Sequence, residues 1–97
     1  MKLAGANLLG EFAASHSDVR KALAEWARIV QNAQWNSPQD ILREFPRASA
    51  VAGNRLVFRI RGNNYRVIVK INYPFKIVEI RFVGTHAEYD RVDAEAV

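Results

Sequence analysis

The 97-residue sequence has no cysteine, only two histidines and no long run of apolar residues. Without cysteine, the chain forms neither disulfides nor cysteine-ligated zinc sites, and its redox compartment stays undetermined. No apolar stretch approaches the roughly 18 residues that a membrane-spanning helix needs. The opening residues, MKLAGANLLGEF, hold a single lysine, and polar residues interrupt their apolar stretch. We therefore expect no signal peptide, no membrane contact and a cytoplasmic location.

Motifs of several common catalytic classes are also missing. The GNN stretch stands between two predicted strands rather than before a helix, so it is not a phosphate-binding loop. His16 and His86 have no spacing suited to a metal site, and no serine occupies the context of a nucleophile elbow. We accordingly expect neither a bound metal nor another cofactor.

Positive charge is present and is concentrated in one segment. The formal net charge is +4. Residues 55–81 hold seven lysines and arginines against one glutamate, a balance of +6, whereas residues 82–97 hold one arginine against four acidic residues, a balance of −3. Such a concentrated field favours a polyanionic partner, above all a nucleic acid. A solvated basic face without a partner is the alternative.

Apolar spacing predicts helices in the first half of the chain. Residues that recur at intervals of three and four predict an amphipathic helix over residues 18–34, which Ser15 or Ser17 can cap. A shorter helix is expected before it, with its apolar side inward. Trp26 and Trp35 fall at spacings typical of the core, so we assign them to packing rather than to a ligand platform.

The stretch SPQD predicts the start of a third, short helix. Ser37 takes the cap position, Pro38 takes the first helical position, and Asp40 stands where it can complete a capping box. The Phe45–Pro46 step predicts the end of this helix, because the residue before a proline disfavours helical geometry.

In the second half of the chain the apolar period changes to 2, which predicts three strands: RLVFRIR, YRVIVKINY and KIVEIRFV. The stretches GNN and YPFK between them suit hairpin turns. A two-residue turn at Asn63–Asn64 pairs Phe58 with Val69, and a turn at Pro74–Phe75 pairs Val69 with Ile80. Both registers keep the apolar residues on one face, so we predict an antiparallel meander with helices on that face. On the last strand the inward residues are Val78, Ile80 and Phe82.

The opposite face of this meander is predicted to be basic. In the same registers Arg61 lies across from Arg66, and like charges in this position destabilise a sheet. Lys70 lies across from Glu79, which predicts a simple cross-strand ion pair. Because Arg61 and Arg66 have no carboxylate opposite them, we interpret this face as a binding surface for an anionic ligand. Its five cationic residues are Arg59, Arg61, Arg66, Lys70 and Arg81.

The segment IRFVGTHAEYD places proton-transfer groups where the last strand ends. Thr85 and Glu88 have capping-box spacing, so a short helix is expected after Gly84. His86 and Tyr89 are three residues apart and project from the same side of that turn, at or near the edge of the basic face. His86 can act as a base or as an acid, and a purely structural histidine is the alternative.

Three stretches, SPQDI, NRLVFRIRGNNYRVIVKINY and IRFVGTHAEYDRVDAE, resemble the HigB-type toxins of bacterial type II toxin–antitoxin systems, which belong to the RelE-like ribonucleases. The resemblance covers about residues 8–95, so residues 1–97 are expected to form a single toxin domain. It implies an α+β fold, the RelE-like microbial ribonuclease fold. In this fold N-terminal helices pack on one face of a small antiparallel sheet, the RNA groove lies on the other face, and a short C-terminal helix follows.

The same resemblance implies an activity and partners. The activity is endonucleolytic cleavage of mRNA, typically on the ribosome and without a metal, which inhibits translation. The expected partner is a HigA-type antitoxin with a helix-turn-helix domain that neutralises the toxin and represses the shared operon. Operator DNA is then contacted only indirectly, through the antitoxin.

Site residues carry over from the resemblance one by one. Arg66 in NNYRV matches the family's basic position on the central strand, and Arg81 matches the arginine of the IRF strand. His86 and Tyr89 match the histidine and tyrosine of the THxEYD motif. The N-terminus departs from the family, because it lacks the extra basic residues often found there and has Ser17 where many relatives have proline. Contacts of the N-terminus with RNA or antitoxin are therefore left open.

For this family we expect the ribose 2′-hydroxyl to attack the adjacent phosphorus and to leave a cyclic phosphate. Arg66 and Arg81 are expected to bind the phosphate, and His86 is the main candidate for acid or base. Tyr89 stacks on a base or performs the second proton transfer, and Lys70 is an alternative proton-transfer group. The residues expected to bind RNA along the basic face are Arg59, Arg61, Arg66 and Lys70.

Two other functions stay open. One is a non-catalytic RNA-binding module that uses the same basic face; it predicts that changing His86 alters neither RNA affinity nor biological effect. The other is a protein-interaction domain whose basic face docks an acidic segment of a partner; it predicts weak RNA binding.

Overall fold

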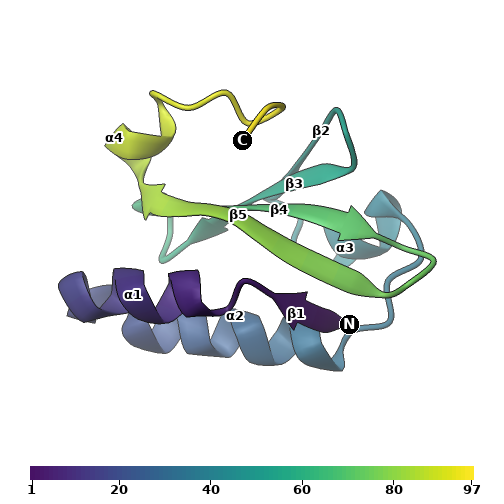
Figure 1. Ribbon diagram of the computed structural model, residues 1–97, viewed down its shortest axis with the longest axis horizontal. Coiled ribbons are helices and arrows are strands. Elements are labelled where there is room, and N and C mark those ends of the chain that lie inside the picture. Colours follow the sequence, from purple (N-terminus) through teal and green to yellow (C-terminus); the bar gives the residue numbers. More distant parts are fainter.

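A five-stranded sheet lies at the centre of the protein, and the computed structural model describes all of residues 1–97. The strands are β1 (Lys2–Ala4), β2 (Ser49–Val51), β3 (Arg55–Ile60), β4 (Tyr65–Asn72) and β5 (Ile77–Thr85). The helices are α1 (Asn7–Ser15), α2 (Arg20–Asn32), α3 (Pro38–Glu44) and α4 (His86–Tyr89). Helices α1 and α2 cover one face of the sheet, and α4 lies on the other (Figure 1). None of the helices is both long enough and apolar enough to cross a membrane.

The strands follow the order β1-β5-β4-β3-β2. The predicted meander of β3, β4 and β5 is confirmed, because β3 pairs antiparallel with β4 and β4 pairs antiparallel with β5. Two edge strands were not predicted: β1 pairs in parallel with β5, and β2 pairs antiparallel with β3. Each has three residues, which is too short for a period of 2 to show in the sequence. The α+β class is confirmed.

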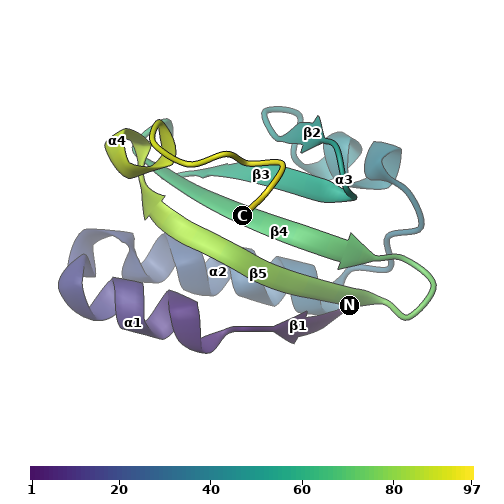
Figure 2. The same ribbon diagram turned by 45° about the horizontal axis from the view of Figure 1, so that its top comes forward.

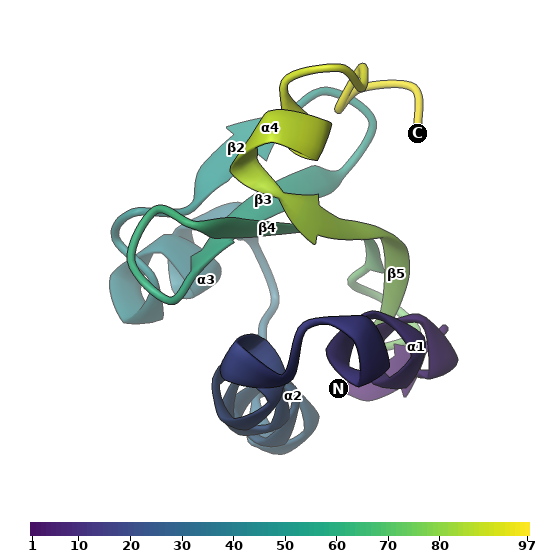
Figure 3. The same cartoon turned by 90° about the vertical axis from the view of Figure 1, so that its left-hand side faces the viewer.

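The core lies between the sheet and helices α1 and α2 (Figure 3). Leu23, Trp26 and Val30 of α2 are buried there, on the apolar stripe that the sequence predicts. The Trp26 ring packs edge-on against Phe58 of β3, with 5.3 Å between ring centroids, and Trp35 lies over the same ring at 6.4 Å. Both tryptophans are 2% exposed, so the prediction that they belong to the core is confirmed.

The predicted helix starts are only partly right. Ser37 caps α3 as expected, because its hydroxyl accepts the Asp40 N–H, but the Asp40 carboxylate accepts the N–H of Asn36 instead of completing a capping box. For α2 the predicted serine cap is wrong. A 3₁₀ turn over Ser17–Val19 leads into the helix. Backbone carbonyl oxygens accept hydrogen bonds from N–H groups at the start of the helix, so no serine side chain is needed as a cap.

The predicted register of the β3–β4 hairpin is wrong by two residues. Arg59, and not Arg61, lies opposite Arg66. The turn spans residues 61–64, because Arg61 and Gly62 adopt positive φ angles of 54° and 67° and the ladder ends before them. An even shift leaves the strand side chains on their predicted faces. The pairs observed in place of the predicted ones are Leu56 with Val69, Phe58 with Val67, and Ile60 with Tyr65.

The β4–β5 hairpin has the predicted register as far as Val69, which pairs with Ile80. Beyond this pair a β-bulge adds one residue to β5, so Arg81 has no partner in the ladder and Phe82 pairs with Ile68. The predicted inward position of Phe82 is therefore wrong. The bulge turns Phe82 to the face away from α1 and α2, and the residue after it packs against the core.

The C-terminal residues 90–97 run back over the face opposite α1 and α2 (Figure 2). On that face Val57 and Ile68 are 3% and 0% exposed, although neither belongs to the core on the helix side. Arg55 Nε donates to the carbonyl oxygen of Val97 at 3.0 Å. The C-terminal segment thus covers the apolar centre of a face that the sequence predicts to be basic throughout.

Asp18 ties the start of α2 to the β3–β4 hairpin. Its carboxylate accepts the Tyr65 hydroxyl at 2.6 Å and an Arg61 N–H at 2.9 Å. The hydrogen bond from Tyr65, helped by the charge of Arg61, holds the pKa of Asp18 below its usual value of 3.8. The same hydrogen bond raises the pKa of Tyr65.

We expect Asp18→Asn to destabilise the fold more at neutral pH than in acid. A carboxyl whose pKa is lowered by folding contributes stability above its unfolded pKa, and this contribution is lost as the pH falls through the lowered folded pKa. The midpoints of urea unfolding for wild type and variant should therefore differ at neutral pH and converge in acid. Glu11→Gln, which removes an exposed carboxylate without hydrogen bonds, is the control. A difference that does not depend on pH would contradict this role of Asp18.

Candidate functional site

Arg66, on the central strand β4, is the one buried charged residue, with 5% of its surface exposed. Its guanidinium donates to the carbonyl oxygens of Asn63 (2.9 Å) and Tyr65 (3.2 Å) and to the side-chain oxygen of Asn63 (2.8 Å). All three acceptors are neutral, and no carboxylate forms an ion pair with Arg66. Burial, and then the charge of Arg59, lower the pKa of Arg66, but a guanidinium stays protonated in proteins. The strand therefore carries a buried positive charge that has no ion-pair partner, although the charge of nearby Asp90 acts on it favourably.

The charges of two further arginines act on this guanidinium. Arg59 lies directly opposite Arg66 in the β3–β4 ladder, and Arg47 is close enough for its charge to contribute to the lowered pKa of Arg66. Arg47 and Arg59 are exposed, and neither forms an ion pair. We call Arg47, Arg59 and Arg66 the arginine cluster. Like charges so placed destabilise a sheet, whereas a phosphate can be bound by several guanidinium groups at once.

Sequence reasoning missed Arg47. It lies in the loop between α3 and β2, where no alternation assigns a side chain to a face. The only signal in the sequence is an unpaired basic residue after the Phe45–Pro46 step, which is too common to single out.

The short helix α4 carries both residues of the THxEYD motif. The predicted capping box is confirmed: the Thr85 hydroxyl accepts the Glu88 N–H at 3.2 Å, and the Glu88 carboxylate accepts the Thr85 N–H at 2.8 Å. The hydrogen bond from the Thr85 backbone is the main cause that lowers the pKa of Glu88, so this carboxylate is engaged as a cap. The ring of Tyr89 lies 5.3 Å from the guanidinium carbon of Arg66, which is a cation–π contact.

Both the backbone and the ring of His86 contact neighbouring residues. Its N–H donates to the carbonyl oxygen of Asn64 at 2.9 Å, which ties α4 to the β3–β4 turn. Its Nδ1 lies 3.1 Å from a carboxylate oxygen of Asp90, and 46% of the His86 side chain is exposed. Nε2 makes no hydrogen bond within the protein. A histidine that is oriented by a carboxylate and has one free ring nitrogen can exchange a proton with a bound substrate.

Gly84 allows α4 to approach the sheet. It lies opposite Arg66 in the β4–β5 ladder, on the face away from α1 and α2. A Cβ at this position would lie 2.5 Å from the Phe82 ring and 3.3 Å from the Glu88 Cβ. Because the first of these contacts is too short for any real side chain, a residue other than glycine would push the Phe82 ring or α4 away from the sheet.

Arg61, which was predicted to lie across from Arg66, leaves the sheet at the turn. Its positive φ directs the chain out of the ladder, and its guanidinium pairs with Asp18 at 2.9 Å. The prediction that Arg61 has no carboxylate partner is therefore wrong, and Arg61 stands apart from the arginine cluster.

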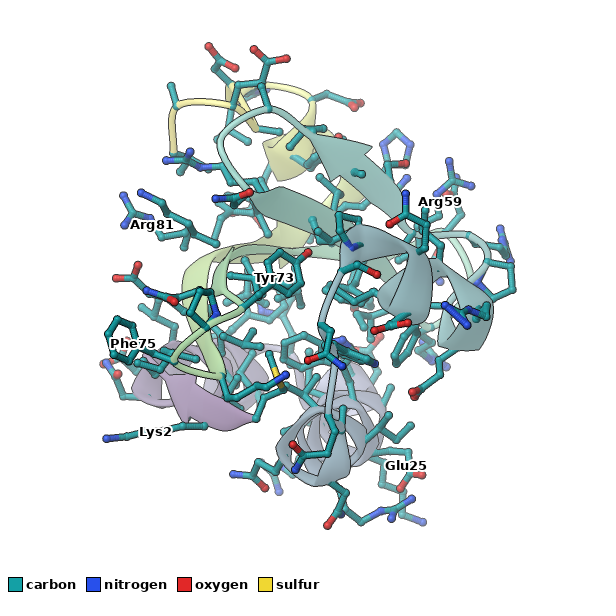
Figure 4. All side chains as sticks on the ribbon, turned by 90° about the vertical axis from the view of Figure 1, so that its right-hand side faces the viewer. Lys2, Glu25, Arg59, Tyr73, Phe75 and Arg81 are labelled. Atoms are coloured by element: carbon teal, nitrogen blue, oxygen red, sulfur yellow. The ribbon has the colours of Figure 1, made fainter.

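Arg81 and Lys70 also lie away from the arginine cluster. Arg81 occupies the bulge of β5 and pairs with Glu79 at 3.1 Å, and Figure 4 shows it on the flank of the molecule opposite to Arg59. The predicted Lys70–Glu79 ion pair is wrong: the two residues are opposite each other, but Glu79 pairs with Arg81. Lys70 follows Arg66 by four residues on β4 and borders a separate groove of about 540 Å³.

The other histidine packs against an aromatic side chain. His16 stacks on Phe12 with 3.9 Å between ring centroids, and its Nδ1 lies 3.2 Å from the Phe12 carbonyl oxygen. The structure brings together no group of three or more His, Cys, Asp or Glu side chains that could hold a metal ion. The groups assembled at the site are thus the arginine cluster, the His86–Asp90 pair and the ring of Tyr89.

Comparison with known proteins identifies the family of the chain. A family model described as HigB toxin, the RelE-like toxic component of a toxin–antitoxin system, matches residues 19–92. The mRNA interferase HigB of Escherichia coli O6:H1 (strain CFT073) is 29% identical over 73 residues, which are 73% of this chain and 71% of the relative. The matched residues include the whole of β3, β4, β5 and α4. The chain therefore belongs to the HigB family of RelE-like toxins.

Proposed function

We propose that this protein is an endoribonuclease that cleaves mRNA, as the name of its E. coli relative indicates for that relative. The observation that carries the proposal is the buried charge of Arg66, which has only neutral acceptors and lies under the ring of Tyr89. A phosphodiester of RNA supplies the missing ion-pair partner, and the bases next to it supply a partner for the aromatic ring.

The reaction that suits these groups is an internal transesterification. The ribose 2′-oxygen forms a bond to the adjacent phosphorus and gives up its proton, while the bond from phosphorus to the 5′-oxygen breaks and that oxygen takes up a proton. A cyclic phosphate remains on one product, and the other has a free 5′-hydroxyl. The site must therefore supply a base, an acid and cations for the charge that grows on the phosphate.

The residues divide these tasks as follows. The arginine cluster binds the non-bridging oxygens of the phosphate, where guanidinium groups stabilise the developing charge. His86, held through Nδ1 by Asp90, transfers a proton through Nε2. Tyr89 contacts Arg66 and so lies next to the phosphate site. It stacks on a base next to the scissile bond or performs the second proton transfer.

Arg81 and Lys70 take part in this proposal as RNA-backbone contacts outside the reacting centre. Arg81 lies beyond the bulge, and Lys70 lies roughly 13 Å along β4 from Arg66, because a strand rises about 3.3 Å per residue. Arg61 has its charge already paired with Asp18, so we assign it to the hairpin rather than to RNA.

We further propose that cleavage takes place on the ribosome in the cytoplasm and inhibits translation. The antitoxin partner in this proposal is of the HigA type, with a helix-turn-helix domain, so operator DNA is contacted only through it. Membership of a toxin–antitoxin family supports a neutralising partner and an RNA target.

The proposal leads to a prediction about cleavage itself. In a translating extract, wild type is expected to cut messages within their translated regions, and His86→Ala and Arg66→Ala are each expected to reduce the cutting rate by about 100-fold or more, because each removes a proton-transfer or charge-stabilising group. Primer extension on the messages locates and counts the cuts. Arg28→Ala, which removes an exposed helix ion pair, is the control and should cut like wild type.

Other outcomes would change the assignment. If wild type binds RNA but makes no cuts, the protein is an RNA-binding module and the catalytic proposal is wrong. If His86→Ala cuts like wild type, proton transfer belongs to Tyr89. Circular dichroism of each variant, with Arg66→Lys as a charge-conserving replacement for the buried arginine, separates loss of fold from loss of function.

A further prediction compares two arginines of one hairpin. Arg59→Ala should weaken RNA binding and make the dependence of log K on log salt shallower by about 0.7, the value for one lost phosphate contact on a single strand. Arg61→Ala should leave this slope unchanged and lower the urea midpoint instead, because Arg61 is paired with Asp18. Equal effects of the two substitutions on the slope would contradict the placement of Arg59 in the site.

A further inference from the structure

We propose that Asn63 is a positioning residue: it orients the Arg66 guanidinium for a phosphate without neutralising its charge. This inference rests on the proposed function, because it assigns a role within the same site. Nothing in the sequence marks Asn63, which stands in a polar hairpin turn where asparagine is common.

The geometry of the contact is specific. Asn63 provides two of the three acceptors of Arg66: its carbonyl oxygen accepts one terminal guanidinium nitrogen at 2.9 Å, and its Oδ1 accepts the other at 2.8 Å. Two acceptors on one residue, meeting both ends of a planar group, fix the plane of that group as well as its position. The Tyr89 ring lies against the same guanidinium.

The chemistry of the acceptor matters as much as its position. An amide oxygen carries no net charge, so the hydrogen bond orients the guanidinium and leaves its full charge available to a ligand. An aspartate at this position offers similar oxygen acceptors but adds a negative charge beside a buried cation, where the attraction between the two is strong. Asparagine is therefore the residue that holds Arg66 and keeps it cationic.

The turn that carries Asn63 also anchors the proton-transfer group. The next residue, Asn64, accepts the backbone N–H of His86 at 2.9 Å, and Arg61 at the start of the turn is tied to Asp18. The same four residues therefore fix the guanidinium and the start of α4. A change at Asn63 is expected to disturb the arginine through its side chain only, because the backbone contacts of the turn stay in place.

Two substitutions test this role in different ways. Asn63→Ala removes Oδ1 and frees one end of the guanidinium, so the cleavage rate at saturating RNA should fall by about 10- to 100-fold, as expected for a misplaced group, with an unchanged salt slope. Asn63→Asp keeps an acceptor but pairs the charge, so affinity should fall and the salt slope should become shallower by about 0.7. Binding is measured with a short, labelled, fully 2′-O-methylated RNA, which cannot be cut through its 2′-oxygen.

Controls and contrary outcomes are clear-cut. Asn7→Ala and Asn7→Asp make the same chemical changes on α1, across the sheet from the site, and should leave both rate and slope unchanged. The proposal is overturned if Asn63→Ala cuts at the wild-type rate, or if Asn63→Asp retains the wild-type salt slope. If wild type makes no cuts at all, the proposed nuclease function fails, whereas the salt slope of Asn63→Asp still decides the role of Asn63 in binding.

Discussion

The burial of the Arg66 charge is the constraint on which the geometry of the site depends. Moving an ion out of water is unfavourable by several kcal/mol unless other groups replace the solvent. Here the replacements are three neutral oxygens and the ring of Tyr89. Two of the oxygens belong to Asn63, so the β3–β4 turn must keep its shape, and the ring belongs to α4, so α4 must lie over the sheet. One side chain thereby fixes the positions of a hairpin and a helix.

A single extra residue in β5 makes this arrangement possible. Without the bulge at Arg81, strict alternation from Ile80 would direct Phe82 and Gly84 toward the helices on the other face. With the bulge, Gly84 lies opposite Arg66, and the missing Cβ leaves room for the turn into α4. Without the bulge Arg81 would pair with Ile68 and Val83 would lie opposite Arg66. The bulge therefore replaces a side chain opposite Arg66 with glycine, which lets α4 approach the arginine.

Features that depend on nearby residues could be predicted from the sequence, and features that depend on backbone detail could not. Alternation and helical spacing correctly predicted the faces of the strands and the burial of the tryptophans. Cap chemistry correctly predicted that α4 starts after Thr85. Nothing in the sequence indicates that Arg61 adopts a positive φ. The predicted turn length and the predicted cross-strand partner of Arg66 were therefore wrong. The sequence of β5 keeps its apolar alternation across the bulge. The prediction from this alternation therefore placed Phe82 on the wrong face of the sheet. Arg47 joins the site only through tertiary structure.

The arginine cluster forms no ion pair with the carboxylates of the neighbouring elements. Asp90 is engaged by His86, Glu88 caps α4, and Glu79 pairs with Arg81. Because each of these carboxylates has another contact, none forms an ion pair with the cluster, although the charge of Asp90 acts favourably on Arg66. Three like charges repel one another in the free protein, and a bound anion relieves this repulsion. In the proposed reaction the negative charge of the phosphodiester grows as the 2′-oxygen attacks. Fixed cations would therefore stabilise the transition state more than the ground state, which a static anion cannot exploit.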